Sequence, residues 1–510
     1  MTSVISPSIV LAVMGVHFLC LLAIGQITGR GAGNAAFFLA NRAAPWWLVG
    51  IGMVGATISS ITFVSVPGAV GTAGLNHSFS YLQFVLGNMA GYAISALLLL
   101  PVYYRMKLVS IYGYLEERLG IAASRTGAVC FMLARFLGTA IRLYIFVIAL
   151  QTFVLGPLGL PPALSAIGVP LLIWAYSFRG GTKTLVITNA LQAVLLIGIV
   201  VWTLDDVATH LGGSLGALWN SVWHSSYSQV FFFSGGWSDP SNFFKQFLAG
   251  ALMTTCTTGL DQSQMQRNLS CRNVRESRKN MLLTSVSILA ANLLFLILGA
   301  ALYLFVAAKG LHPPPKSDDL YAFLSFHYLS PVMPLLFMMG LLACTYSTTD
   351  SALTSITTSF CMDILGFERE KLPANPSVEA KQRRQRLVVH FGFTVALILS
   401  IFVLQALRTA TTLNLLFDLL GFAYGPILGL FTFGFLTRWR VRKAHVPAVC
   451  VCALVLTYLI DSHSAAWFSG LQLGFLKIAV SGLLTFAGLW SIRERKPSQL
   501  LSVSHSTGND

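Results

Sequence analysis

The sequence predicts an all-α polytopic membrane protein with about 13 transmembrane helices, and three observations lead to this fold class. Of the 510 residues, 55% are hydrophobic and only 10% are charged, a balance that excludes an ordinary soluble protein. Apolar stretches of about 18 residues or more recur along the chain, as helices that cross a bilayer require. A transmembrane barrel would instead show short strands of alternating polarity.

The expected spans occupy most of the chain and leave only polar loops between them. Hydropathy places them at residues 7–28, 46–71, 79–104, 126–154, 163–178, 184–204, 242–262, 281–307, 331–365, 387–407, 412–436, 444–461 and 471–492. No segment between them is long enough for a separate soluble domain. The ten His are scattered, the eight Cys show no metal-ligand spacing, and protease and hydrolase signatures are absent. We therefore expect neither an enzyme nor a transition-metal site.

Positive charge is distributed unevenly between the loops on the two sides of the membrane. The loops after odd-numbered spans carry Arg30 and Arg42; Arg105, Lys107, Arg118 and Arg125; Arg179 and Lys183; Arg267 to Lys279; Arg369 to Arg386; Arg438 to Lys443; and Arg493 to Lys496. The opposite loops hold little beyond Lys309, Lys316 and Arg408. The positive-inside rule then places the N-terminus outside and the C-terminus in the cytoplasm. This topology accounts for the net charge of +15, so no nucleic-acid partner is expected.

Spans two and seven are both interrupted by clusters of Gly, Ser and Thr. The first reads MVGATISSITFVSVPG from Met53 to Gly68, and the second reads GALMTTCTTGLDQ from Gly250 to Gln262. We expect each to unwind near mid-membrane and to expose backbone carbonyls to a ligand. The two spans are five apart, and an odd offset inverts topology, so a five-plus-five inverted repeat would make them the first helices of each half.

Span nine carries a hydroxyl stripe in the segment ACTYSTTDSALTSITTSFCMDIL. On a helix, the face roughly 100° wide that forms this stripe contains Cys344, Ser347, Thr348, Ser351, Ser355 and Thr358. Oxygen ligands in a membrane span suit a hard cation such as sodium. Small polar residues also line helix contacts in membranes, which is the alternative explanation. Asp350 in the same segment favours an ion site, because an ionisable group at membrane depth is costly and usually functional.

Span four buries Arg135 and Arg142 seven residues apart, so both lie on one helix face about 10 Å from each other along the axis. A buried Arg needs a partner, and we expect either Asp350 or a carboxylate of the substrate. Other candidate substrate contacts are polar side chains near mid-membrane: Thr57, Ser59, Ser60, Thr62, Gln83, Asn88, Thr254 and Thr255. Each alone could simply be a helix-packing residue. Together they favour a polar, hydrogen-bonding substrate.

Six sequence strings in this order resemble the sodium/solute symporter family, and SSITF and FML resemble its sialic acid carriers. The strings are FFLANRAAPWW, ATISSITFVSVPG, GGTKTLVITNALQ, DQSQMQRNLSCRNVRESRK, STTDSALTSITTSFCMDI and GPILGLFTFGF. The resemblance implies a leucine-transporter-like five-plus-five inverted repeat. Residues 37–438 would form its ten-helix core, residues 1–30 an accessory first helix, residues 439–496 two further accessory helices, and residues 497–510 a disordered cytoplasmic tail. Sialic acid carriers also place an Arg on span four, at the position of Gly138, which supports an anionic substrate.

The resemblance also implies a sodium site with residues from spans two and nine. Its ligands would be the carbonyls of Gly55, Ile58 and Cys344 and the hydroxyls of Ser347 and Thr348. The chain departs from many relatives at Asn189, where they carry Asp. We hypothesise that Asp350 replaces that charge, so that Asn189, Asp350 and Ser351 form a second cation or proton site. In the alternative interpretation, Asp350 pairs with an Arg or completes a polar network.

The resemblance implies a sodium-coupled secondary active symporter, in a bacterial-type inner or plasma membrane. It would import a small polar organic solute, such as a sugar, a sialic acid or another small carboxylate, by alternating access. A proton-coupled carrier of the same fold that uses Asp350 is the alternative. The expected partners are this solute, Na⁺ and the lipid bilayer, without an obligate protein partner.

Overall fold

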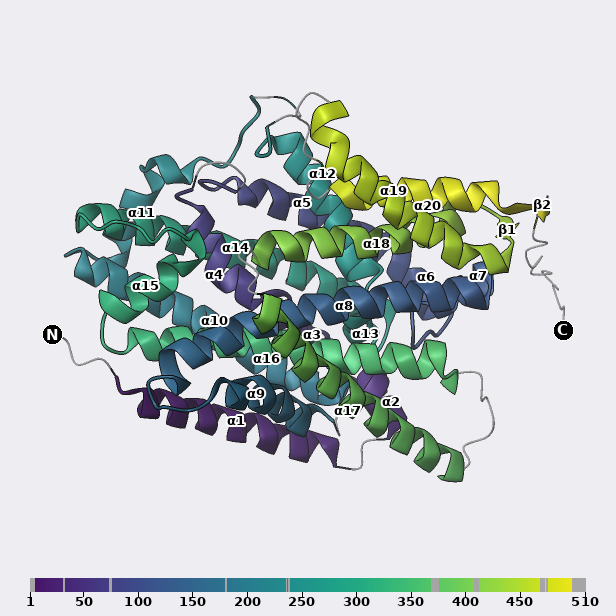
Figure 1. Ribbon diagram of the computed structural model, residues 1–510, viewed down its shortest axis with the longest axis horizontal. Coiled ribbons are helices and arrows are strands. Elements are labelled where there is room, and N and C mark those ends of the chain that lie inside the picture. Colours follow the sequence, from purple (N-terminus) through teal and green to yellow (C-terminus); the bar gives the residue numbers. More distant parts are fainter. Residues whose placement is uncertain are drawn as a thin grey trace, which may run out of the picture.

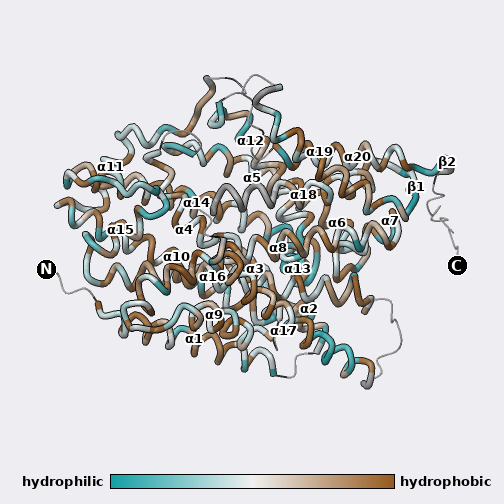
Figure 2. Tube along the Cα trace, viewed as in Figure 1, coloured by the Kyte–Doolittle hydropathy of each residue, from teal (hydrophilic) through white to brown (hydrophobic). Residues whose placement is uncertain are grey.

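Helices dominate the structure, a computed structural model, and most of the long ones run along the long axis of the molecule (Figure 1). The structure describes residues 5–30, 33–72, 76–178, 181–234, 236, 239–367, 376–407, 412–467, 473 and 476–497. Hydrophobic residues follow the long helices, and a hydrophilic stretch marks the N-terminal part of α17 (Figure 2). The described chain is that of an all-helical membrane protein, apart from one small sheet.

The first half of the chain begins at α1 and ends in a short surface helix, α11. Its helices are α1 (Pro7–Gly29), α2 (Asn34–Leu39), α3 (Trp46–Thr57), α4 (Ser60–Ala69), α5 (Tyr81–Ile94), α6 (Leu100–Arg105), α7 (Gly113–Leu119), α8 (Ile121–Leu150), α9 (Pro162–Ser177), α10 (Thr182–His210) and α11 (Leu215–Trp223). The π-helical turns Ser95–Leu99 and Gln151–Leu155 extend α5 into α6 and lengthen α8.

The second half contains the other broken span and the two strands. Its elements are α12 (Phe243–Thr254), α13 (Gln262–Asn268), α14 (Val274–Ala308), α15 (Leu320–His327), α16 (Met333–Ser359), α17 (Pro376–Leu407), α18 (Thr412–Leu436), β1 (Trp439–Val441), α19 (Val446–Trp467), α20 (Lys477–Ser491) and β2 (Arg493–Pro497). The antiparallel pair of β1 and β2 was not predicted from the sequence. The expected disordered tail, residues 497–510, lies outside the described residues apart from Pro497.

Each of the thirteen expected spans falls on a helix or a pair of helices. Within the described residues, seven helices are long and apolar enough to cross a membrane, or up to eight if the bent pair α3 and α4 is one span. Three further spans correspond to shorter apolar helices, Pro162–Ser177, Gly421–Leu436 and Lys477–Ser491. The two others are the broken pair α12 and α13 and the hydroxyl-rich α16. Which ends of these helices lie outside the membrane stays a prediction.

Both predicted interruptions are confirmed. Helices α3 and α4 are bent by 64° at their break. Ser59 begins the second half, because its hydroxyl accepts a hydrogen bond from the Thr62 amide at 3.3 Å. Span seven passes from α12 through a π-helical turn, Thr255–Gly259, and restarts at α13. Asp261 caps that second half by accepting from the Gln264 amide at 3.0 Å.

The first half of the broken span two packs tightly on α10. A side chain at Gly55 would bring its Cβ to 2.4 Å from the carbonyl oxygen of Asn189, so only glycine fits this approach of two backbones. Helix α16 also contacts α3 and α10 and is buried along most of its length. The close packing therefore places the hydroxyl stripe next to the break.

Candidate functional site

Helices α3 and α16 meet at the predicted sodium ligands. The Ser347 hydroxyl donates a hydrogen bond to the Gly55 carbonyl at 2.7 Å and lies 3.2 Å from the Cys344 carbonyl. The Thr348 hydroxyl donates to the same Cys344 carbonyl at 2.8 Å. The structure thus brings four of the five predicted oxygens together around one buried point.

Ile58, the fifth predicted ligand, is the residue at which α3 ends. Its side chain is buried and its backbone has left the helical region, with a ψ of 114°. In a continuous helix the Thr62 amide would bind the Ile58 carbonyl, but here that amide donates to the Ser59 hydroxyl. The break therefore leaves the Ile58 carbonyl available to a ligand, as at other discontinuous membrane helices.

A second polar group lies one turn further along α16. Asn189 on α10 donates to the Ser351 hydroxyl at 3.0 Å, and Ser351 lies 3.2 Å from Asp350 Oδ1. The Asn189 Oδ1 atom is buried without a hydrogen-bond partner among the described residues. The three residues of the hypothesised second site are therefore neighbours, and one of them offers a free oxygen.

Tyr176, on α9, completes this group and was missed by sequence reasoning. Its hydroxyl donates to Asp350 Oδ2 at 2.6 Å, and its ring is almost fully buried. Tyr176 lies in an ordinary apolar stretch of α9, so nothing local distinguishes it. The other carboxylate oxygen, Oδ1, points toward Ser351.

Arg135 has a partner that the sequence analysis did not consider. Its Nη2 atom lies 3.4 Å from Oδ1 of Asp261, the residue at the break in span seven. Tyr424 on α18 donates to the Oδ2 atom of the same carboxylate. Neither of the expected partners, Asp350 or a substrate, is needed to compensate this arginine. A charged residue inside an interrupted span was the signal available for Asp261.

Arg142 is not paired in this way. Among the described residues, no carboxylate lies within ion-pair distance of its guanidinium, and its Nε atom is buried without a partner. The backbone places it at the level of the break in span two, because the Ser60 hydroxyl donates to the Arg142 carbonyl at 3.3 Å. An arginine without a counter-charge thus lies beside the unwound segment.

The predicted substrate residues in span two are brought to the same region. The Thr57 hydroxyl donates to the Met53 carbonyl at 2.7 Å and accepts from Gln264 on α13 at 3.3 Å. This contact joins the broken parts of spans two and seven. Ser59 and Thr62 lie within hydrogen-bond distance of each other, at 3.3 Å between their hydroxyls.

The candidates in spans three and seven make mainly protein contacts. Both polar atoms of the Gln83 amide bind the loop before α12, since its Nε2 donates to the Ser241 carbonyl at 2.9 Å and its Oε1 accepts from the Phe232 amide at 3.1 Å. With its amide oriented to satisfy its neighbours, Asn88 donates to the Thr254 hydroxyl at 2.9 Å. Thr255 donates to its own helix, at the Ala251 carbonyl. The polar side-chain atoms of these residues thus contact protein groups in this conformation.

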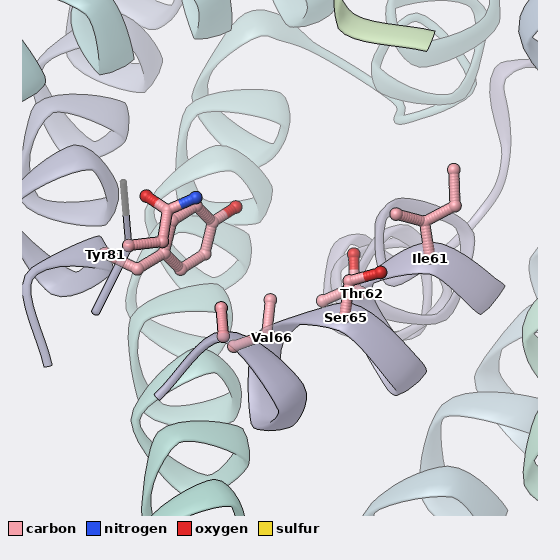
Figure 3. Close-up of a pocket in the computed structure, with 7 residues that line it drawn as sticks. Ile61, Thr62, Ser65, Val66 and Tyr81 are labelled. Atoms are coloured by element: carbon pink, nitrogen blue, oxygen red, sulfur yellow. The ribbon is translucent and has the colours of Figure 1, made fainter. Parts of the chain in front are cut away.

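A cavity lies along α4, between the break and the start of α5 (Figure 3). Its volume is about 40 Å³, and it is lined by Ile61, Thr62, Ser65, Val66, Ala69, Asn76 and Tyr81. Thr62 is the predicted substrate residue in this set. The space suits a few water molecules but not an organic solute, which needs several hundred Å³. Helix α4 or α5 would have to move to admit a solute at this position.

Comparisons with known proteins agree on one family. The model of the Sodium:solute symporter family matches residues 37–436. The sodium/sialic acid symporter NanT of Aliivibrio fischeri is 25% identical over 478 residues, covering 91% of this chain and 90% of that protein. The human sodium/iodide cotransporter is 27% identical over 426 residues, covering 79% of this chain and 62% of that protein.

A solved structure shares the fold. It is the substrate-bound, outward-open state of a Na⁺-coupled sialic acid symporter, with a TM-score of 0.78 and 20% sequence identity. The match covers 94% of this chain and 96% of that one. The arrangement of helices around the two breaks is therefore that of a known transporter fold.

Proposed function

The chain belongs to the Sodium:solute symporter family and is a sodium-coupled solute symporter, and we propose that it imports a small polar organic solute by alternating access. A sugar, a sialic acid or another small carboxylate would fit the polar residues around the two breaks. The observation that carries the proposal is the 2.7 Å contact between Ser347 and the Gly55 carbonyl, which joins the buried α16 to the broken span two.

We propose that sodium binds at this junction, to the carbonyls of Gly55, Ile58 and Cys344 and the hydroxyls of Ser347 and Thr348. The ligand atoms are all neutral oxygens, which suit a hard cation that must also leave the site easily. The Ser347 proton would rotate away from Gly55 to free both oxygens for the ion. Sodium bound here would favour one relative position of α3 and α16, and would shift the transporter's conformations only through that difference in affinity.

A second cation or proton site is proposed at Asn189, Asp350 and Ser351. The supporting contacts are the hydrogen bond from Asn189 to Ser351, the 3.2 Å approach of Ser351 to Asp350 Oδ1, and the unpartnered Oδ1 atom of Asn189. The carboxylate at Asp350 would supply the charge that many relatives place at position 189. If it bound a proton instead of sodium, the protein could work as a proton-coupled carrier of the same fold.

The proposed solute site lies beside the break in span two. Arg142, Thr57, Ser59, Ser60 and Thr62 would contact the solute there. The unpaired Arg142 favours a carboxylate-bearing solute, because a guanidinium at membrane depth is stabilised by a bidentate anion. Two of the relatives are named for the transport of sialic acid and iodide, which is consistent with an anion.

The helices would lie in a bacterial-type inner or plasma membrane. The N-terminus would lie outside the cell, and the C-terminus would lie in the cytoplasm. The ten-helix core at residues 37–438 would contain the inverted repeat. The 64° bend in span two and the restart of span seven at Asp261 support it, because equivalent first helices of two halves should break alike.

Sodium stabilisation of a Ser347→Ala variant tests the proposed site. Removing one oxygen ligand of the cation should cost about as much as removing a hydrogen bond to a charged group, about 1.5–3 kcal/mol, so we expect sodium affinity to fall about 10- to 100-fold. The measurement is the thermal unfolding midpoint of the purified protein over a sodium chloride titration, with potassium chloride keeping the ionic strength constant.

Thr345→Ala is the matched control for this experiment. Thr345 is buried on the same helix, but its hydroxyl donates to the Leu341 carbonyl of its own turn. It should keep the wild-type sodium dependence. Equal sodium affinity in wild type and Ser347→Ala would contradict the proposed site.

A further inference from the structure

The two arginines on α8 differ in how their charges are compensated. Asp261 forms an ion pair with Arg135, and Tyr424 donates to the same carboxylate. Asp261 is fully buried, so one carboxylate joins α8, α18 and the start of α13. Arg135 is therefore held as a neutral pair by protein groups alone.

Arg142 faces the interior of the protein and not the lipid. The exposed side chains Leu133 and Leu137 mark the outer face of α8, and Arg142 lies about 140–180° around the helix from them. Among the described residues no carboxylate lies within ion-pair distance of its guanidinium. Its position beside Ser60 puts this free charge next to the break in span two.

Arg267 on α13 is held by a protein contact. It donates to Gln264 at 2.8 Å, and its charge interacts with those of Asp261 and Asp350. Arg142 has no carboxylate within ion-pair distance among the described residues, and Asp261 acts on its charge only at longer range. A guanidinium at this depth is best stabilised by one carboxylate bound through two parallel hydrogen bonds.

We propose that Asp261 determines the charge class of the solute, because it occupies Arg135 and leaves Arg142 as the single anchor for a monoanion. This inference rests on the proposed function and refines its substrate class. A dianion would require a second cation, and the nearest one, Arg135, lies about 10 Å along the helix but is bound to Asp261. Asp261 is thus a specificity-determining residue that acts through Arg135 without touching the solute.

Asp261 also has a structural role, and the test must separate the two. Its Oδ1 atom accepts from the Gln264 amide and caps α13. Asp261→Asn preserves that cap with its amide oxygen, since Asn and Asp are equally good N-cap residues, and its NH2 group, at the position of Oδ2, can donate to the Tyr424 hydroxyl. The substitution therefore removes the charge while keeping the local hydrogen bonds.

The experiment compares the binding of butyrate and N-acetylneuraminate, which are monoanions, with that of succinate, a four-carbon dianion matched to butyrate. Binding is measured by calorimetry on the purified full-length protein in sodium buffer. Wild type should bind a monoanion in preference to succinate. Asp261→Asn frees Arg135, so the succinate affinity relative to the monoanions should rise about tenfold.

The reverse and double variants complete a charge cycle. Arg135→Gln leaves Asp261 without its partner beside Arg142, so all three anions should bind less tightly. The double variant Arg135→Gln/Asp261→Asn removes both charges and should restore the wild-type preference for monoanions. A purely structural role for Asp261 predicts instead that the double variant is at least as impaired as either single variant.

Asp363→Asn is the matched control, because Asp363 is also a buried carboxylate but accepts from Ser110 and Ser359. It should leave the preference unchanged. A wild type that prefers succinate or binds neither monoanion, or an unchanged ratio in Asp261→Asn, overturns the inference. Sodium-dependent thermal stabilisation is recorded for every protein. Its absence in wild type would contradict the proposed function, whereas stabilisation with unaltered acid preference contradicts only the role of Asp261.

Discussion

Individual residues of α16 have separate roles although they share one helical face. Ser347 and Thr348 contact the carbonyls near the break, whereas Ser351 connects Asn189 with Asp350. Helical spacing was sufficient to predict that these hydroxyls share a face, because the pattern is local. The spacing could not predict that Tyr176 would bind Asp350 or that Asp261 would bind Arg135. Such pairs join distant segments, and only the fold determines which polar groups meet.

Asp350 gives a prediction at this scale. In Asp350→Asn the second site loses its only full charge, so we expect a lower Hill slope for sodium-dependent uptake, approaching unity, and a flatter pH profile. Uptake into proteoliposomes as a function of sodium concentration and of pH provides the measurement. A variant with the wild-type Hill slope and pH profile would show that Asp350 only completes a polar network with Tyr176 and Ser351.

Short element α2 connects the broken span two to several neighbours. Arg386 on α17 donates to Asn34 at 2.8 Å, and its guanidinium lies 4.0 Å from the centre of the Phe37 ring. The Phe38 carbonyl accepts from Thr182 on α10 and from Gln266 on α13. Because α2 leads directly into α3, which carries Gly55 and Ile58, these contacts restrain the helix that would have to move during transport.

Removing one of the contacts of α2 should allow α2 and the start of α3 to move more readily. Arg386→Ala loses a charged hydrogen bond and a cation–π contact, so we expect about tenfold faster labelling of the buried Cys271 by a thiol reagent. Cys271 is a suitable reporter because its backbone pairs with Ala44, directly before α3. Labelling is followed by mass spectrometry in a variant whose other cysteines are replaced by serine or alanine.

Arg384→Ala is the control for this prediction, since Arg384 is exposed on the same helix. It should label at the wild-type rate, and sodium should slow labelling in all proteins by holding α3 against α16. Equal rates for Arg386→Ala and Arg384→Ala would show that α2 does not restrain the movement.

At the scale of the whole molecule, the fold was more predictable than the sites. Hydropathy predicted thirteen spans, each of which falls on a helix or a pair of helices, and clustered Gly, Ser and Thr located both breaks. Bilayer thickness and backbone hydrogen bonding constrain helices strongly, which makes these features predictable. The sheet between β1 and β2 escaped prediction, since three-residue strands such as Trp439–Val441 have no clear periodicity. Gln83 shows the limit for sites: a polar residue in a span predicts a contact, but not whether a solute or the protein makes it.

We propose that a sodium ion between α3 and α16 drives accumulation of the solute. The most direct measurement is uptake of N-acetylneuraminate and butyrate into proteoliposomes with an inward sodium gradient, compared with equal sodium on both sides and with a proton gradient alone. We expect accumulation above the external concentration only with the sodium gradient, and its loss in Ser347→Ala but not in Thr345→Ala. Accumulation driven by the proton gradient without sodium, or undiminished accumulation in Ser347→Ala, would contradict it.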